Sequence, residues 1–149
     1  MMDLKWMPKG KGLDYPNPDL FEPSRAHLGD AGFDLKCAEN VTIMPHSYKF
    51  ISFGIALEIP DGYFGLLAGR SGLGKKGIGL THGVGIVDSG FRGELGATFM
   101  NNTGHNVCFY KGDRIAQIIM VPYTTGDVVK VDSMTMSDRG ENGYGSTGI

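Results

Sequence analysis

The sequence contains no apolar run that approaches the roughly 20 residues a helix needs to span a bilayer. Its first residues, MMDLKWMPKGKGLDYP, lack the apolar stretch of a secretory signal peptide. We therefore expect a soluble protein that stays in the cytoplasm and does not associate with membranes.

An excess of positive charge is absent as well. Lysine and arginine number 14 against 16 aspartates and glutamates, which gives a formal net charge of -2. Proteins that bind nucleic acid or anionic surfaces usually carry a basic excess or patch. We therefore expect neither nucleic acid nor a membrane as a partner.

Cysteine is also scarce, and the chain holds only Cys37 and Cys108. The two do not have the spacing of a metal site, and both stand in apolar segments. Such cysteines are typically buried free thiols in a reducing compartment, so we expect both to be buried and unpaired.

Glycine, in contrast, is abundant, with 24 residues in a chain of 149. The glycines follow no period, which excludes a collagen-like repeat. At this density they predict many tight turns, or a backbone that approaches a ligand closely. The length and the 41% of hydrophobic residues suit one domain with a real core.

Short alternating apolar segments dominate the chain, and Gly, Pro, Asn and Asp separate them. This pattern predicts an all-β fold, either a sandwich, a barrel or a jelly roll. The Asp61-Gly62 pair predicts a turn, and internal glycines limit any helix over 70–77 to about one turn. The expected strands cover residues 41–45, 49–60, 62–69, 94–101, 106–110, 113–123 and 127–132.

Irregular segments flank this core. Residues 9–31 are rich in Pro, Gly and Asp, and we expect them to run over the surface after a short first strand at 3–7. Beyond the last expected strand the chain turns polar again. We therefore expect a single domain over residues 1–149, with a core at about 32–131 and a C-terminal arm at about 133–149.

The segment AGFDL, residues 31–35, places Asp34 inside an expected strand. A carboxylate in a half-buried strand is costly unless it is paired or ligated. Two interpretations stay open: Asp34 lies on the solvent face of the strand, or it has a charged partner or a ligand.

A polar residue also interrupts the apolar segment KGDRIAQIIM, residues 111–120. Strand alternation puts Gln117 on one face with Ile115 and Ile119, and Ala116 on the other. The Gln117 amide therefore needs a partner, which is either structural or a ligand.

The segment GRSGLGKKGI, residues 69–78, combines Arg70 and Ser71 with several glycines. A guanidinium, a hydroxyl and free backbone N–H groups suit a phosphate chain. The segment lacks the spacing of a Walker A loop, so an ordinary basic turn remains the alternative.

The segment GVGIVDSGFRGELG, residues 83–96, carries a carboxylate at the end of an expected strand. Gly83 and Gly85 allow the backbone to approach a flat ligand. Asp88 is placed to act as a general base on a water molecule, or simply to open an Asp-Ser-Gly turn.

The last segment, RGENGYGSTGI, residues 139–149, is a polar tail or a ligand-binding loop. Tyr144 offers a face on which a base can stack, while Ser146, Thr147 and Arg139 suit phosphates. Together, the five segments describe a ligand with a flat ring, a sugar and several phosphates, beside a carboxylate that can activate water.

In this order, the five segments resemble the five motifs of the homotrimeric dUTP diphosphatase (dUTPase) family, over about residues 31–149. The resemblance implies a jelly-roll-like β-barrel and a homotrimer with sites at its subunit interfaces. It implies magnesium-dependent hydrolysis of dUTP to dUMP and pyrophosphate, which lowers dUTP and supplies dUMP for dTTP synthesis. It also implies a flexible C-terminal arm that closes a neighbour's site.

The resemblance also assigns roles to residues. Asp88 is the expected catalytic base for the water that attacks the α-phosphorus, and Asp34 is expected to contact magnesium only through water. Phe91 stands where the family usually has Tyr, whose ring packs on the deoxyribose, and His82 stands where another polar residue is common. The expected substrate-binding residues are Gly69, Arg70, Ser71, Gly72, His82, Gly85, Ile86, Val87, Phe91, Gln117, Arg139, Tyr144, Gly145, Ser146 and Thr147.

Two alternatives differ in activity. A dCTP deaminase of the same fold needs a catalytic glutamate, but here Asp88 leads the DSGFRG run and Glu94 lies beyond it. Some phage proteins of this fold instead regulate a partner protein. An inserted loop or a damaged motif would favour that role, and the sequence has neither between its five motifs.

Overall fold

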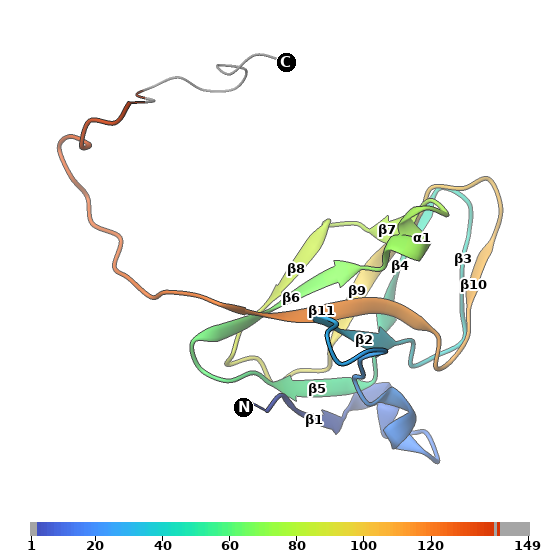
Figure 1. Cartoon of the computed structure of the whole chain (residues 1–149). Helices are drawn as coiled ribbons and strands as arrows, with labels where there is room; N and C mark the ends of the chain where they lie inside the picture. The colour runs from blue at the N-terminus through green and yellow to red at the C-terminus, as the bar shows by residue number, and fades with distance from the viewer. Residues whose placement is uncertain (1–2, 139, 141–149) are drawn as a thin grey trace.

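The computed structural model describes residues 3–138 and residue 140. Strands account for nearly all of its regular structure (Figure 1). The strands are β1 (Lys5–Pro8), β2 (Gly32–Lys36), β3 (Val41–Ile43), β4 (Ser47–Ser52), β5 (Ile55–Glu58), β6 (Tyr63–Gly69), β7 (Ile78–Leu80), β8 (Val84–Val87), β9 (Gly96–Asn101), β10 (Val107–Phe109) and β11 (Arg114–Pro122). The other elements are the 3-10 turns η1 (Gly10–Gly12) and η2 (Pro18–Phe21) and the helix α1 (Ser71–Gly74). The all-β fold, the short first strand and the one-turn helix are confirmed.

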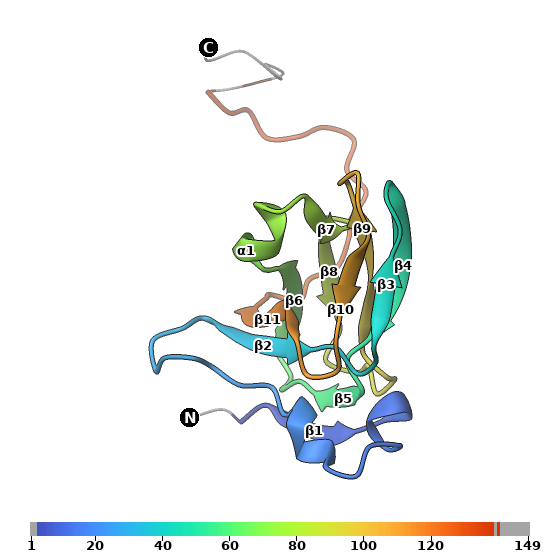
Figure 2. The same ribbon diagram turned by 90° about the vertical axis from the view of Figure 1, so that its right-hand side faces the viewer.

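Antiparallel pairing joins the strands into small sheets around a shared core (Figure 1 and Figure 2). The largest sheet has the order β2-β11-β6-β8, and a three-stranded sheet has the order β4-β9-β7. Two further pairs join β1 to β5 and β3 to β10. Strands that are far apart in the sequence are thus neighbours, as in jelly-roll-like folds. No helix in the described part of the chain combines the length and apolar character of a membrane span.

Alternation of side chains explains how these strands build the core. In β9, Ala97 and Phe99 point inward and are almost fully buried, while Thr98 and Met100 point outward. The largest side chains of the core come from several sheets and from η2: Phe21, Leu35, Ile43, Ile51, Phe53, Ile55, Phe99, Ile115 and Ile118. Burial of these groups is the main stabilising contribution to the fold.

The segment 49–60 was expected to form one strand, and the structure corrects this. The chain bends at Gly54, which has a φ of +70°, and this bend separates β4 from β5. The Gly54 carbonyl accepts a hydrogen bond of 2.9 Å from the Lys9 amide. A Cβ atom on Gly12 would lie 1.9 Å from the same carbonyl. The N-terminal turn therefore packs backbone against backbone at this bend, a contact that only glycine allows.

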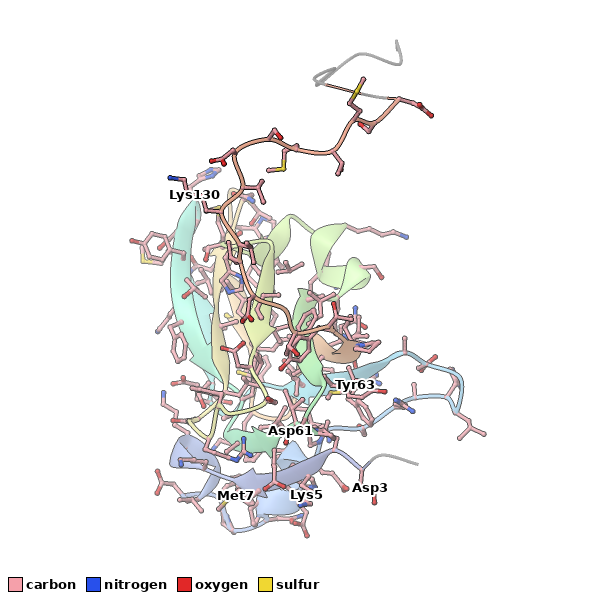
Figure 3. The ribbon with its side chains drawn as sticks, turned by 90° about the vertical axis from the view of Figure 1, so that its left-hand side faces the viewer. Asp3, Lys5, Met7, Asp61, Tyr63 and Lys130 are labelled. Atoms are coloured by element: carbon pink, nitrogen blue, oxygen red, sulfur yellow. The ribbon has the colours of Figure 1, made fainter. Side chains whose placement is uncertain are left out.

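The expected strand at 127–132 is absent, which is a second correction. After Pro122 the described chain leaves the sheets as an extended segment (Figure 1), and Val128, Val129 and Val131 are all exposed. Lys130 of this segment lies at the opposite end of the molecule from β1 (Figure 3). The β-branched pattern predicts a strand, but within this one chain the segment has no strand partner among the described residues.

A third correction concerns β11. Its pairing with β2 shifts register between Arg114 and Ala116, which marks a bulge. Ile115 and Ala116 are consecutive and yet both fully buried, and so is Ile118. Ile115 therefore does not lie on the same face of the strand as Gln117, because the bulge interrupts the alternation that the sequence predicts.

The two cysteines differ from each other, which corrects the expectation that both are buried. Cys37 is fully buried, and burial raises the pKa of its thiol to about 11. Cys108 is exposed, with its sulfur 3.3 Å from the Thr42 hydroxyl. Both are free thiols, as expected.

Candidate active site

Asp34 is paired with two arginines. Of its two interpretations, a solvent-facing carboxylate or one with a charged partner, the structure therefore supports the second. β2 places Asp34 opposite Gln117 of β11, and the Asp34 side chain is only 14% exposed. The Arg70 Nε atom lies 3.0 Å from one carboxylate oxygen, and the Arg114 guanidinium lies 3.2 Å from the other. Arg70 follows β6, and Arg114 opens β11, so this one carboxylate links the ends of neighbouring strands.

Gln117 completes the polar surface around this carboxylate. Its amide nitrogen donates a 3.2 Å hydrogen bond to the Gly69 carbonyl. Its amide oxygen passes so close to Gly32 that a Cβ atom there would lie 2.6 Å away. Gln117 therefore has a structural partner on one side, and its oxygen lies above the glycine of β2.

These groups line a cavity of about 290 Å³, which we call the arginine pocket. The first residues of α1 and the segment that leads into β2 form its walls. Its lining residues are Ala26, Asp30, Ala31, Gly32, Asp34, Arg70, Ser71, Gln117 and Ile119. A guanidinium, a hydroxyl and an amide around one cavity form a suitable site for phosphate oxygens.

A second cavity, of about 330 Å³, lies along β8, and we call it the hairpin pocket. β8 is the edge strand of its sheet and pairs only with β6 among the described residues. An edge strand leaves backbone N–H and C=O groups free for a ligand. The lining residues are Phe50, Leu67, His82, Gly85, Ile86, Val87, Asp88, Phe91, Glu94, Leu95 and Gly96.

Asp88 and Phe91 stand on one tight turn at the end of β8. The Phe91 amide donates a 3.1 Å hydrogen bond to the Asp88 carbonyl. The guanidinium of Arg92 donates to the carbonyls of Ser89 and Phe91 and so holds the turn from outside. Both Asp88 and Phe91 are exposed and line the hairpin pocket, so a carboxylate and an aromatic ring face the same cavity.

The two pockets share no lining residue in the described part of the chain. Asp88 belongs to the hairpin pocket, whereas Arg70, Ser71 and Gln117 belong to the arginine pocket. One chain therefore presents the expected base and the expected phosphate ligands in different places. The expected site residues Arg139, Tyr144, Gly145, Ser146 and Thr147 lie outside the described residues.

Three residues of this region were not assigned from the sequence. Arg114 belongs to the same segment as Gln117, residues 111–120, but its pairing with Asp34 depends on strand order. Asp30 lines the arginine pocket, and its carboxylate accepts a hydrogen bond from the His27 amide. Arg92 follows the residues of the DSGF turn, and no local pattern marks it as the group that holds them.

The residues present fit a magnesium ion only as outer contacts. Residues 3–138 and 140 contain no group of three or more His, Cys, Asp or Glu side chains arranged to hold a metal. Both oxygens of Asp34 already face guanidinium groups. Magnesium retains much of its hydration and often binds through substrate phosphates, and such an ion needs few protein ligands.

Comparison with known proteins places the chain in a family. The dUTPase family model matches residues 20–148. The deoxyuridine 5'-triphosphate nucleotidohydrolase of Tropheryma whipplei (strain Twist) is 38% identical over 130 residues, which cover 86% of this chain and 89% of that protein. The dUTPase of Staphylococcus bacteriophage 80alpha with dUPNHPP has a TM-score of 0.88 and 29% identity, with all of both chains covered. A mutant dUTPase of phage phi11 of S. aureus, described with a structural Mg(II) ion, has a TM-score of 0.79 and 25% identity over 91% of this chain and all of that one.

Proposed function

This chain belongs to the dUTPase family and is a dUTP diphosphatase, and we propose that its active site is assembled from more than one copy of the chain in a homotrimer. One copy supplies the hairpin pocket with Asp88, and another supplies the arginine pocket. The observation that carries this proposal is the separation of the two pockets, which share no lining residue. A substrate with a base at one end and three phosphates at the other needs both sets of groups.

The hairpin pocket suits the nucleoside part of dUTP. The free backbone edge of β8 offers N–H and C=O groups for the uracil edge, and the residues that supply it are Gly85, Ile86 and Val87. Phe91 presents its ring to the same cavity, where it would pack on the deoxyribose and leave no space for a 2′-hydroxyl. Recognition here depends on backbone groups and shape rather than on charge.

The arginine pocket suits the triphosphate. Arg70 and Ser71, which line the pocket, bind phosphate oxygens, and Gln117 contacts the region of the α-phosphate. Gly69 and Gly72 adjoin Arg70 and Ser71 in the sequence and allow close approach of the backbone. When bound, Mg2+ would neutralise phosphate charge and orient the chain of phosphates. Asp34 would contact its water shell, and the paired arginines hold that carboxylate in place.

Asp88 performs the proton transfer. Its carboxylate takes a proton from a water molecule as the water oxygen attacks the α-phosphorus in line. A new bond forms between that oxygen and the α-phosphorus, while the bond to the oxygen that bridges the α- and β-phosphorus breaks. The products are dUMP and pyrophosphate. Arg70 and Ser71 stabilise the charge that develops on the phosphate oxygens.

A homotrimer, as in the family, would bring the two pockets together. Tyr48 and Phe50 of β4, and Val84 and Ile86 of β8, are exposed apolar side chains in and beside the hairpin pocket. Apolar side chains gathered in this way are typical of interfaces. The C-terminal arm, with the proposed ligands Arg139, Tyr144, Gly145, Ser146 and Thr147, would close the site of a neighbour, as lids do in many enzymes.

The environment of Glu94 argues against the deaminase alternative. Its carboxylate accepts hydrogen bonds from the Lys11 amide and from the Ser52 hydroxyl, and so fastens η1 to the end of β4. These contacts give the Glu94 carboxylate a structural role, which does not favour the deaminase.

Pyrophosphate release from dUTP, dTTP, dCTP and UTP, measured in parallel with Mg2+, tests this function. We expect turnover of dUTP alone, because the hairpin pocket excludes the other bases and Phe91 excludes the ribose. Turnover of UTP would locate a defect at Phe91. Turnover of none of the four would contradict the proposed function and favour the regulatory role.

A further inference from the structure

Residues 82–84 form an unusually tight turn at the start of the hairpin pocket. The Val84 amide donates a 2.8 Å hydrogen bond to the His82 carbonyl, and Gly83 between them has a φ of +72°. This combination is a γ-turn with positive φ, which is rare and strained. Residues 81–84 are all exposed, so little packing holds this turn in place.

The side chain of His82 closes the same turn from the other direction. Its Nδ1 atom lies 2.8 Å from the Val84 carbonyl oxygen. A carbonyl only accepts, so Nδ1 must carry the hydrogen and donate it. The His82 carbonyl therefore binds the Val84 amide, and the His82 side chain binds the Val84 carbonyl.

The imidazole ring also reaches the wall of the pocket. A Cβ atom on Gly85 would lie 3.3 Å from the His82 Cε1 atom and 3.2 Å from the Leu67 Cβ atom. The ring and Leu67 thus both lie close to the side of Gly85 on which a Cβ atom would stand. Because Gly85 lines the hairpin pocket, a shift of the turn would displace the edge on which the base is read.

We infer that His82 is a positioning residue: its Nδ1–H donor locks the turn at Gly83 and so presets the backbone of β8 for the base. This inference rests on the proposed function, in which that backbone reads uracil. The donor holds the pocket in shape before the substrate arrives, so its loss weakens binding more than the chemical step.

Two substitutions separate the donor from the ring. His82→Asn keeps an N–H group close to the position of Nδ1 and removes the rest of the ring, whereas His82→Phe keeps a ring and removes the donor. In the full-length protein with dUTP and Mg2+, we expect His82→Phe to raise KM about 5-fold with kcat within about 2-fold, the size of effect that one hydrogen bond provides. We expect His82→Asn to raise KM less than His82→Phe does, because the Asn amide retains an N–H donor.

Equal KM values for the Phe variant and the unmodified protein would overturn the inference, and so would an equal rise in both variants. Hydrogen exchange of peptides that cover residues 80–88 gives an independent measurement without substrate. We expect faster exchange in His82→Phe than in His82→Asn, and equal exchange would overturn the inference. If the unmodified protein fails to turn over dUTP, the proposed function fails, while the exchange measurement still tests the lock itself.

Discussion

The arginine pocket and the hairpin pocket are built on opposite principles. In the arginine pocket, two arginines from the ends of β6 and β11 meet on one carboxylate of β2, Asp34. In the hairpin pocket, the wall is the backbone of an edge strand, and most of the side chains around it are apolar or absent. Charge suits phosphates, which are alike in every nucleotide, while a fixed backbone edge suits a base, which must be told apart from others.

The difference extends to how each region is held. Ion pairs and the amide of Gln117 cross-link the arginine pocket within one chain. The hairpin pocket depends on local turns: the one at Gly83 and the one that Arg92 holds between Asp88 and Phe91. Substitutions should therefore act differently in the two places, through charge in the first and through backbone position in the second.

Asp88 is one of the few charged residues that line the hairpin pocket, and its substitution has the largest expected effect. Asp88→Asn preserves the shape of the side chain and removes the base, so we expect kcat for dUTP to fall about 1,000-fold. The dissociation constant of a non-hydrolysable dUTP analogue should stay within about 3-fold, because recognition by the β8 backbone is unchanged. Single-turnover rates and calorimetric titration provide the two measurements.

Asp61→Asn is the matched control, since Asp61 stands in the exposed turn between β5 and β6 and lines neither pocket (Figure 3). It should leave both constants unchanged. A kcat above one tenth of the normal value in Asp88→Asn would exclude Asp88 as the base.

Arg70→Gln comes next in size. It removes a cation that faces the phosphates and leaves Asp34 with Arg114 as its one remaining partner, so we expect kcat/KM for dUTP to fall about 100-fold. Arg25→Gln is the control, because Arg25 stacks on the Phe33 ring 4.0 Å away and does not line the arginine pocket. Steady-state kinetics that show similar losses in both variants would contradict a specific role for Arg70.

Co-expression of the two inactive variants tests whether the pockets of different copies work together. If each site joins Asp88 of one copy to Arg70 of another in a cyclic oligomer, random mixing leaves about a quarter of the sites intact. We therefore expect about a quarter of the normal activity from hybrids of Asp88→Asn and Arg70→Gln. If both residues of a site came from one copy, mixing would restore nothing.

The sequence predicted most of the strands around the two pockets, and the errors in that prediction have a physical cause. Alternation located most strands because packing on one face imposes a period of two. It failed at Gly54, where a tertiary contact bends the chain, and at 127–132, where no partner lies within the same chain. The bulge beside Ile115 likewise depends on a neighbouring strand.

For the site, the resemblance predicted the motif residues and sites shared between subunits, but it did not predict which residues of one chain line the same pocket. That division follows from the sheet order β2-β11-β6-β8, which puts Asp34 beside Gln117 and moves β8 to the edge. Strand order is not encoded in the spacing of motifs, so the pairing of Arg114 with Asp34 was not predicted. Arg92 acts within its own turn, but no local pattern marks it. The abundance of glycine, in contrast, predicted close approach of the backbone, and Gly85 in the hairpin pocket is where this can be tested.

Gly85→Ala has the smallest expected effect of the three and tests the backbone principle directly. The added methyl group would lie 3.2 Å from the Leu67 Cβ atom, so the strand must move by a few tenths of an ångström. We expect KM for dUTP to rise about 10-fold, with a smaller change in kcat, because the edge that reads the base is displaced while Asp88 and the arginine pocket keep their side chains. Gly79→Ala in β7 is the control, since its methyl group would meet no atom within 4 Å. Equal KM values for the two variants, at equal thermal stability, would show that the backbone of β8 does not recognise the base. Recognition in the hairpin pocket would then depend on side chains such as Phe91, and the contrast with the arginine pocket would be one of side-chain type only.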